Sequence, residues 1–146
     1  MTVPGSVEAW QKQCGEIRAK LNELLGDLPP RPAVSAIQVV STEDKGSYTL
    51  ETVQFDNAAG EIVKGLLFVP KKATAQTRAP AILYCHWHGG QYDIGKNELL
   101  GTNAVPVAAG PALAEAGYVV LGIDAPCFGE RNGQGPDGPQ QKGSAG

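Results

Sequence analysis

Two apolar segments, each followed by a glycine-containing turn, constrain the fold of this 146-residue chain most strongly. Residues 79–85 (APAILYC) run into HWHGG at 86–90, and residues 117–124 (GYVVLGID) run into APCFGER at 125–131. Apolar runs of this length, bounded by glycine and polar residues, are typical of buried parallel strands. Open α/β sheets bind ligands at the carboxyl ends of their strands. The sequence therefore predicts a parallel strand pair with a site just after both strands.

Length, charge and cysteine content limit the class of protein. A chain of 146 residues is enough for one domain with a modest core. The net charge of −3 and the dispersed basic residues argue against a nucleic-acid partner. No apolar stretch approaches the ~18 residues of a membrane helix, and no signal-peptide core is present. Cys14, Cys85 and Cys127 lack CxxC spacing, which predicts reduced, mostly buried thiols in a cytoplasmic protein.

The N-terminal segment 6–25 is predicted to form an amphipathic helix. Ser6 is a suitable N-cap, Glu8 favours the positive end of the helix, and Gly26 is a suitable stop. A proline-rich linker follows at 29–32. The apolar stripe must be buried against the rest of the chain or against a partner. Its residues recur at spacings of three and four: Val7, Trp10, Cys14, Ile17, Leu21 and Leu24.

The middle of the sequence predicts an antiparallel hairpin. Residues 47–55 and 62–69 are rich in β-branched, aromatic and leucine side chains, and the turn sequence DNAAG at 56–60 separates them. The apolar run at 80–85 then supplies a third strand. The hairpin and the two apolar runs together indicate an α/β fold.

A short helix is predicted at 110–116, before the last strand at 118–123. Pro111 lies near its first position and Gly117 just after its end. The connection from the third to the fourth strand is expected to be a right-handed crossover. The final segment holds five glycines, two prolines and no large apolar residue, which predicts a flexible tail. The expected organisation is an N-terminal helix and linker (1–32), an α/β domain (33–131) and the tail (132–146).

Residues 47–131 resemble the first part of an α/β-hydrolase, closest to the dienelactone hydrolase and acetylxylan-esterase-like branch. The matching segments are GLLFVP at 65–70, PAILYCHWHGG at 80–90 and LAEAGYVVLGIDAPCFGER at 113–131. The resemblance implies that these are the first four strands of the sheet, with the fourth strand between the second and the third. It also implies hydrolysis of a small-molecule carboxylic ester by a Ser-His-Asp triad, without metal or organic cofactor.

The family's Gly-x-Ser-x-Gly nucleophile elbow does not occur in these 146 residues. The nearest match, KGSAG at 142–146, has lysine in the first position and no apolar strand before it. The sequence therefore resembles the first part of a hydrolase that ends before the catalytic triad. We expect it to be inactive alone, and to self-associate through the uncovered edge of its third strand.

What the resemblance assigns to this part is the oxyanion-hole loop. In the family, one backbone N–H of the oxyanion hole comes from the loop after the third strand. The resemblance gives this role to His88, with Gly89 as the second choice. Each such donor contributes about 3 kcal/mol to transition-state stabilisation. Substrate contacts are expected from neighbouring residues: His86, Gly90, Gln91, Tyr92, Asp124, Phe128 and Arg131.

Four polar side chains near this loop carry more specific expectations. Asp124 is expected to accept backbone N–H groups in the turn after the fourth strand. Arg131 has three possible partners, namely Asp124, Glu130 or an acidic substrate. Asp93 and Lys96, like Tyr92, could line the pocket, although exposed loop positions are the simpler interpretation.

Two alternatives come from other functional classes. His86 and His88 lie two residues apart at the end of a strand, a spacing found in metal sites, so a metal-dependent hydrolase is possible. A catalytic metal needs a third protein ligand, and the chain has no third histidine. A non-enzymatic interaction module that uses the helix at 6–25 is the other alternative.

Overall fold

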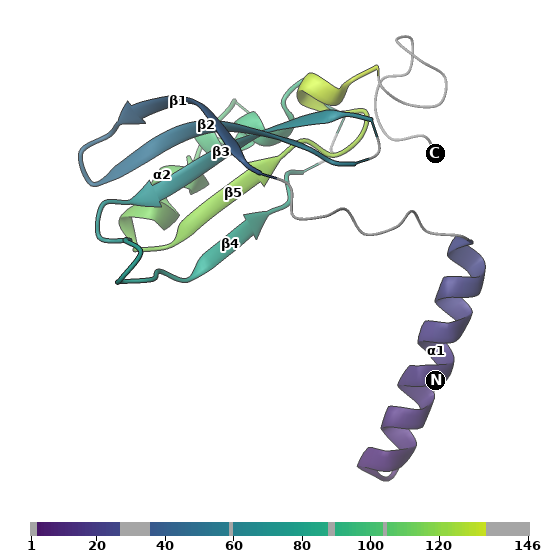
Figure 1. Ribbon diagram of the computed structural model, residues 1–146. Coiled ribbons are helices and arrows are strands. Elements are labelled where there is room, and N and C mark those ends of the chain that lie inside the picture. The colour runs from purple at the N-terminus through teal and green to yellow at the C-terminus, as the bar shows by residue number, and fades with distance from the viewer. Residues whose placement is uncertain (1–2, 27–35, 59, 88–89, 104, 134–146) are drawn as a thin grey trace. The chain divides into compact units, whose positions relative to one another are not determined.

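A computed structural model describes residues 3–26, 36–58, 60–87, 90–103 and 105–133 of the chain. The chain divides into two compact units, Met1–Ala33 and Val34–Gly146. The first contains one long helix, and the second contains a mixed sheet (Figure 1). The predicted linker at 29–32 and most of the predicted tail lie outside the described residues.

The predicted N-terminal helix is confirmed as α1 (Val7–Leu25). The Ser6 hydroxyl accepts the N–H of Ala9 at 3.2 Å, and Gly26 ends the helix with φ 72°. Both caps are those that the sequence predicted, because serine satisfies a free N–H of the first turn and glycine adopts a positive φ without strain. None of the residues of α1 is buried. Among the described residues, no helix is long and apolar enough to cross a membrane.

Five strands form one sheet in the order β1-β2-β3-β5-β4. The strands are β1 (Gln38–Asp44), β2 (Tyr48–Asp56), β3 (Ile62–Pro70), β4 (Ala81–Tyr84) and β5 (Val119–Ile123). β2 and β3 are the predicted antiparallel hairpin, and β4 and β5 are the predicted parallel pair. β5 lies between β3 and β4, as the resemblance implied. β4 is therefore an edge strand, paired with β5 alone in the described sheet.

β1 was not expected from the sequence. This strand pairs antiparallel with β2, has an irregularity between Val39 and Ser41, and is exposed along its whole length. The β-branched residues Val39, Val40 and Thr42 are typical of a strand. Their signal was weak because polar residues surround them and neither face of the strand is buried.

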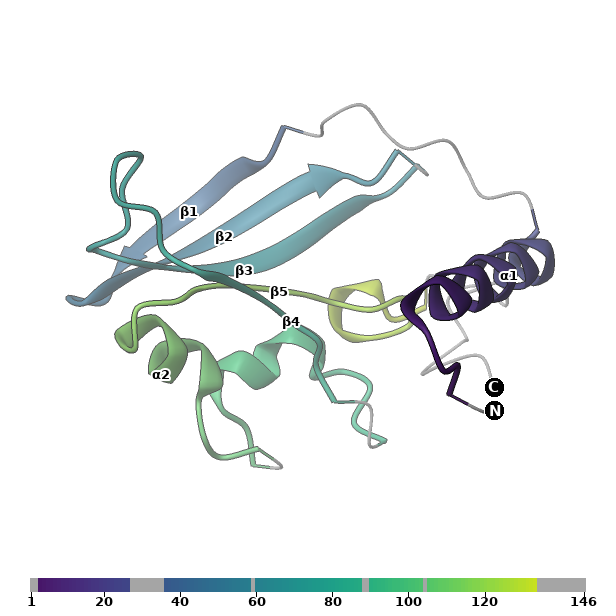
Figure 2. The same ribbon diagram turned by 90° about the horizontal axis from the view of Figure 1, so that it is seen from below.

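One face of the sheet is covered by α2 (Ala109–Glu115) and by the 3-10 helix η1 (Gly95–Leu100), as Figure 2 shows. α2 is the predicted short helix, and Gly117 follows its end with φ 96°. Gly110 leaves room for the ring of Phe68, since a Cβ at this position would collide with that ring. The core of this layer consists of Tyr48, Leu50, Leu66, Phe68, Leu99, Ala114 and Val120.

The opposite face of the sheet keeps part of its apolar surface exposed. Leu83 of β4 is 62% exposed, and Leu121 and Ile123 of β5 are only partly buried. These side chains alternate with Val120, which is fully buried on the covered face. The free edge of β4 adjoins this partly covered apolar surface.

Candidate functional site

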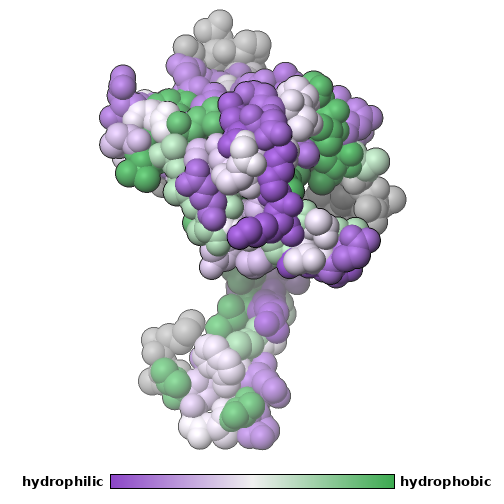
Figure 3. Space-filling view, turned by 90° about the vertical axis from the view of Figure 1, so that its left-hand side faces the viewer, coloured by the Kyte–Doolittle hydropathy of each residue, from purple (hydrophilic) through white to green (hydrophobic). Residues whose placement is uncertain are grey.

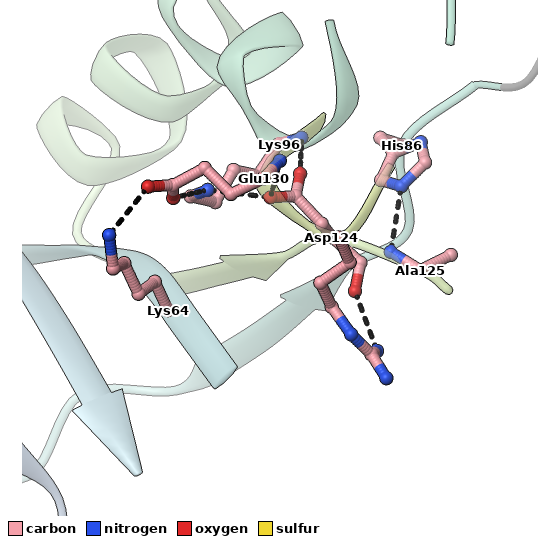
Figure 4. A network of polar contacts seen from close by, with 7 residues as sticks. Lys64, His86, Lys96, Asp124, Ala125 and Glu130 are labelled. Carbon is pink, nitrogen blue, oxygen red and sulfur yellow. Dashed lines mark hydrogen bonds and ion pairs between the residues drawn. The ribbon is translucent and has the colours of Figure 1, made fainter. Parts of the chain in front are cut away.

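The two sequence segments singled out above meet at the carboxyl ends of β4 and β5. These strands run in parallel, with Tyr84 opposite Gly122. Beyond their ends, the His86 ring Nε2 accepts the N–H of Ala125 at 3.0 Å (Figure 4). Because Nε2 is the acceptor, the neutral ring carries its proton on Nδ1, which donates to the Trp87 carbonyl at 2.8 Å. His86 therefore links the loop after β4 to the loop after β5.

Asp124 is the centre of a buried polar network after β5. The Asp124 side chain is 1% exposed. Its Oδ1 accepts the backbone N–H of Lys96 at 2.7 Å, and its Oδ2 accepts the backbone N–H of Glu130 at 3.1 Å. The predicted structural role of Asp124 is thus confirmed for the turn that follows β5. Gly95 and Gly129 have positive φ angles, and a Cβ at either position would collide with the Asp124 carboxylate.

Lys96 corrects the expectation of an exposed loop residue. Its side chain is 4% exposed, and its Nζ donates to Asp124 Oδ2 at 2.6 Å and also to Glu130. Burial alone would lower the pKa of Lys96, but hydrogen bonds and charge from the two carboxylates outweigh it and raise that pKa. A single buried cation therefore holds two carboxylates together. The sequence concealed this role because the carboxylates lie 28 and 34 residues along the chain from the lysine.

Glu130 extends the network to the surface. It also forms an ion pair with Lys64 of β3 at 2.9 Å, where both side chains are about half exposed (Figure 4). Hydrogen bonds from Lys96 and then Lys64 hold the pKa of Glu130 below its usual value.

Arg131 takes neither predicted carboxylate partner. One of its terminal nitrogens donates to the Asp124 backbone carbonyl at 3.1 Å, and the other to Glu61 at 2.6 Å.

Glu98 is a buried side chain whose role was not predicted from the sequence. It is 6% exposed and accepts the Tyr84 hydroxyl at 2.5 Å and the Trp87 N–H at 2.7 Å. The hydrogen bond to Glu98 and then burial raise the pKa of Tyr84 to about 12. Trp87 is consequently held on both sides, its N–H by Glu98 and its carbonyl by His86. No motif marks Glu98, because its role depends on how η1 packs against the end of β4.

The structure brings several predicted substrate contacts together. The buried Phe128 ring lies between His86, at 4.9 Å between ring centroids, and Tyr92, at 5.2 Å. Gly90 and Gln91 are exposed beside them.

His88 and Gly89 lie outside the described residues, so the predicted oxyanion donors and the His86/His88 metal alternative stay untested. Among the residues that are described, no group of three His, Cys, Asp or Glu could hold a metal ion.

An apolar groove of about 240 Å³ adjoins these loops on the carboxyl side of β4 and β5. The exposed Cys85 lies in its lining. All three cysteines are free, but only Cys127 is buried, so the expectation of mostly buried thiols is wrong for Cys85. Other residues of the lining include Leu83, Tyr84, His86, Ile123 and Pro126.

Comparison with known proteins identifies the fold. No family model matches the chain. The chain is 37% identical over 121 residues to a Bacillus subtilis (strain 168) protein named "Putative hydrolase YtaP". The matched region covers 82% of this chain and 40% of that protein. The structure of this chain matches that of a putative acetyl xylan esterase from Bacteroides fragilis. The TM-score is 0.64, and the two sequences are 21% identical over 92% of this chain. The chain therefore has the fold of the first part of an α/β-hydrolase. It spans 40% of the first protein and 35% of the second.

Proposed function

We propose that this chain is the first part of a serine hydrolase that cleaves carboxylic esters, and that it supplies the oxyanion-hole loop. The observation that carries the proposal is the junction between His86 and Ala125 at the carboxyl ends of two parallel strands. This is the edge at which α/β sheets bind their ligands. The names of the two matched proteins, a hydrolase and an acetyl xylan esterase, support ester hydrolysis.

In the proposed reaction, a serine attacks the ester carbonyl and a negative charge develops on its oxygen. The backbone N–H of His88, or alternatively that of Gly89, donates to this oxygen. Two described residues support this role, because both hold Trp87, the residue just before His88. His86 donates to the Trp87 carbonyl, and Glu98 accepts the Trp87 N–H. The adjoining groove is suited to an apolar part of the ester.

The proposal assigns the Ser-His-Asp triad to sequence outside these 146 residues, and the complete enzyme needs no metal or organic cofactor. The purified chain is therefore expected to hydrolyse p-nitrophenyl acetate no faster than free imidazole at the same concentration. A Ser144→Ala variant is the control, since Ser144 occupies the only serine position that resembles an elbow. Saturable turnover that disappears in Ser144→Ala would contradict this assignment.

Two substitutions at position 88 test the oxyanion role in the protein expressed together with its remaining coding sequence. His88→Pro removes the backbone N–H, and kcat is expected to fall by roughly 100- to 1000-fold. His88→Ala keeps the N–H, and most of the activity should remain. The same pair of changes at Gly89 tests the second choice of donor. Loss of activity in His88→Ala together with loss of bound zinc would favour the metal-dependent alternative instead.

Two further properties belong to the same proposal. Free cysteines at all three positions support a cytoplasmic location. The edge of β4 and the partly exposed apolar face beside it are expected to make the isolated chain self-associate. Leu83→Lys, which places a charge on this edge, should reduce sheet-mediated association and the binding of the dye ANS. An isolated chain that is compact and monomeric and does not bind ANS would contradict the proposal of an incomplete domain.

A further inference from the structure

The apolar residues of α1 follow a stricter pattern than amphipathicity requires. Their positions, 7, 10, 14, 17, 21 and 24, are separated by alternating steps of three and four residues. This spacing places them at the a and d positions of consecutive heptads, with a mean period of 3.5 residues. The positions between them are mostly polar or small. α1 therefore carries a narrow apolar seam along its whole length.

The width of the seam indicates what covers it. A helix that packs on a sheet or a globular core presents three or four apolar residues in every two turns, whereas two in seven is the seam of a coiled coil. In the described structure the seam residues Trp10, Leu21 and Leu24 are about half exposed or more, at 48%, 51% and 72%. Both hydrophobic and hydrophilic residues reach the surface of this helix (Figure 3). A second helix with the same seam fits this pattern.

We propose that α1 forms a two-stranded coiled coil with α1 of a second copy of this chain. A heptad seam is complementary to itself, because each a or d side chain inserts between four residues of an identical helix. Within the part of the chain that the structure describes, the other α-helix, α2, has seven residues and lacks such a seam.

The charges beside the seam are compatible with this partner. The flanking e and g positions hold two basic residues, Arg18 and Lys20, and no acidic residue. In a parallel pair Arg18 faces Gln13 and Lys20 faces Leu25, and in an antiparallel pair these bases face Gln11 and Gln13. No like charges meet in either direction. The acidic residues Glu16 and Glu23 lie away from the seam, within reach of Lys12 and Lys20 of the same helix.

The length of α1 makes the interaction weak and dependent on concentration. Nineteen residues span fewer than three heptads, and Ser6 and Gly26 cap the helix at both ends. Coiled coils gain stability with each added heptad, so we expect a dimer in equilibrium with the monomer in the micromolar range or above.

The test uses the full chain carrying Leu83→Lys, so that association through β4 is suppressed. Trp87→Phe leaves Trp10, at a d position, as the only tryptophan. With rising concentration, the sedimentation coefficient should increase from monomer to dimer, and the Trp10 emission should shift to shorter wavelength over the same range. Leu21→Lys is expected to abolish both changes. Ala19→Lys, on the opposite side of the helix, is the matched control and should leave them intact.

Three results would overturn the proposal. The first is a monomer at every concentration, with Trp10 emission that does not change. The second is identical association in Leu21→Lys and Ala19→Lys, when far-ultraviolet circular dichroism shows that both variants keep the helix. The third is a blue-shifted Trp10 emission that is independent of concentration, which would mean that the seam is covered within one chain.

Discussion

The loops that follow β5 and β4 lie side by side but are held in different ways. The loop after β5 is organised around its own buried carboxylate, Asp124, which accepts the N–H of Glu130 in the same loop and two hydrogen bonds from Lys96 of η1. The loop after β4 has no such centre among its described residues. It is held from outside, by Glu98 of η1 and by the contact of His86 with Ala125. The β5 loop is therefore a platform, fixed by its own buried carboxylate, on which the β4 loop is positioned.

This difference matches the proposed roles of the two loops. A backbone donor for an oxyanion must be placed accurately but must also leave its N–H unused by the protein. Trp87, the last described residue before the proposed donor, is held by both its N–H and its carbonyl. The Asp124 loop, in contrast, is held through its own buried carboxylate, which bonds Glu130 of the same loop and Lys96 of η1, and it serves as support.

The largest expected effect is the loss of the cation at the centre of the platform. Lys96→Met leaves Asp124 buried with no cation and removes one partner of Glu130. Removing one member of a buried ion pair typically costs 3–5 kcal/mol, so the free energy of unfolding should fall by about that amount. Lys64→Met, at the half-exposed end of the same network, is the control and should cost about 1 kcal/mol or less. Urea denaturation measures both, and equal effects would contradict the buried role of Lys96.

A smaller effect is expected from the group that holds the β4 loop. Glu98→Ala removes acceptors for the Tyr84 hydroxyl and the Trp87 N–H, and should cost about 2–3 kcal/mol of stability. The sharper measurement is hydrogen exchange at the Trp87 amide, which should become faster in Glu98→Ala. The amides that bind Asp124, at Lys96 and Glu130, should keep their protection. Equal loss of protection in both loops would show that they form one cooperative unit and would remove the contrast between them.

The smallest effect is the pH dependence of the Tyr84–Glu98 pair. The pKa of Tyr84 is raised above the value of 10.0 to about 12, chiefly by its hydrogen bond to Glu98. Because the folded-state pKa is the higher one, the stabilisation is fully present below pH 10 and is lost as the pH rises through about 12. Ultraviolet absorbance of tyrosinate should show a late-titrating group, Tyr84, that ionises at about pH 12. In Glu98→Gln, this group should ionise at a lower pH, while Tyr84→Phe should eliminate it.

The sequence was sufficient to predict the elements with strong local signals. The caps of α1, the β2–β3 hairpin and the two apolar strands all depend on residues close together in the chain, and the structure has each of them. The role of Asp124 as a turn acceptor was also predictable from its place at the end of a strand. The exposed strand β1 escaped prediction because neither face of it shows an apolar period.

The partners of the buried charged residues were not predictable in the same way. Lys96 and Glu98 lie two residues apart in η1, and nothing in their sequence context indicates that both are buried. Their roles arise only when η1 packs on the covered face beside the ends of β4 and β5. Arg131 is a similar case, since its partner Glu61 lies 70 residues away in the chain.

The ion pair between Arg131 and Glu61 has a consequence for the order in which the chain folds. β1, β2 and β3 pair as neighbours in sequence, so they can form as soon as they leave the ribosome. β3 cannot pair with β5 until Ile123 has been made. Lys64 and Arg131 make contacts across 66 and 70 residues, so these must wait for residues 130 and 131. Closing so long a loop costs conformational entropy, and only the contacts formed afterwards offset that cost. The site edge is therefore expected to be the last part of the sheet to assemble during synthesis, onto a meander that has already formed.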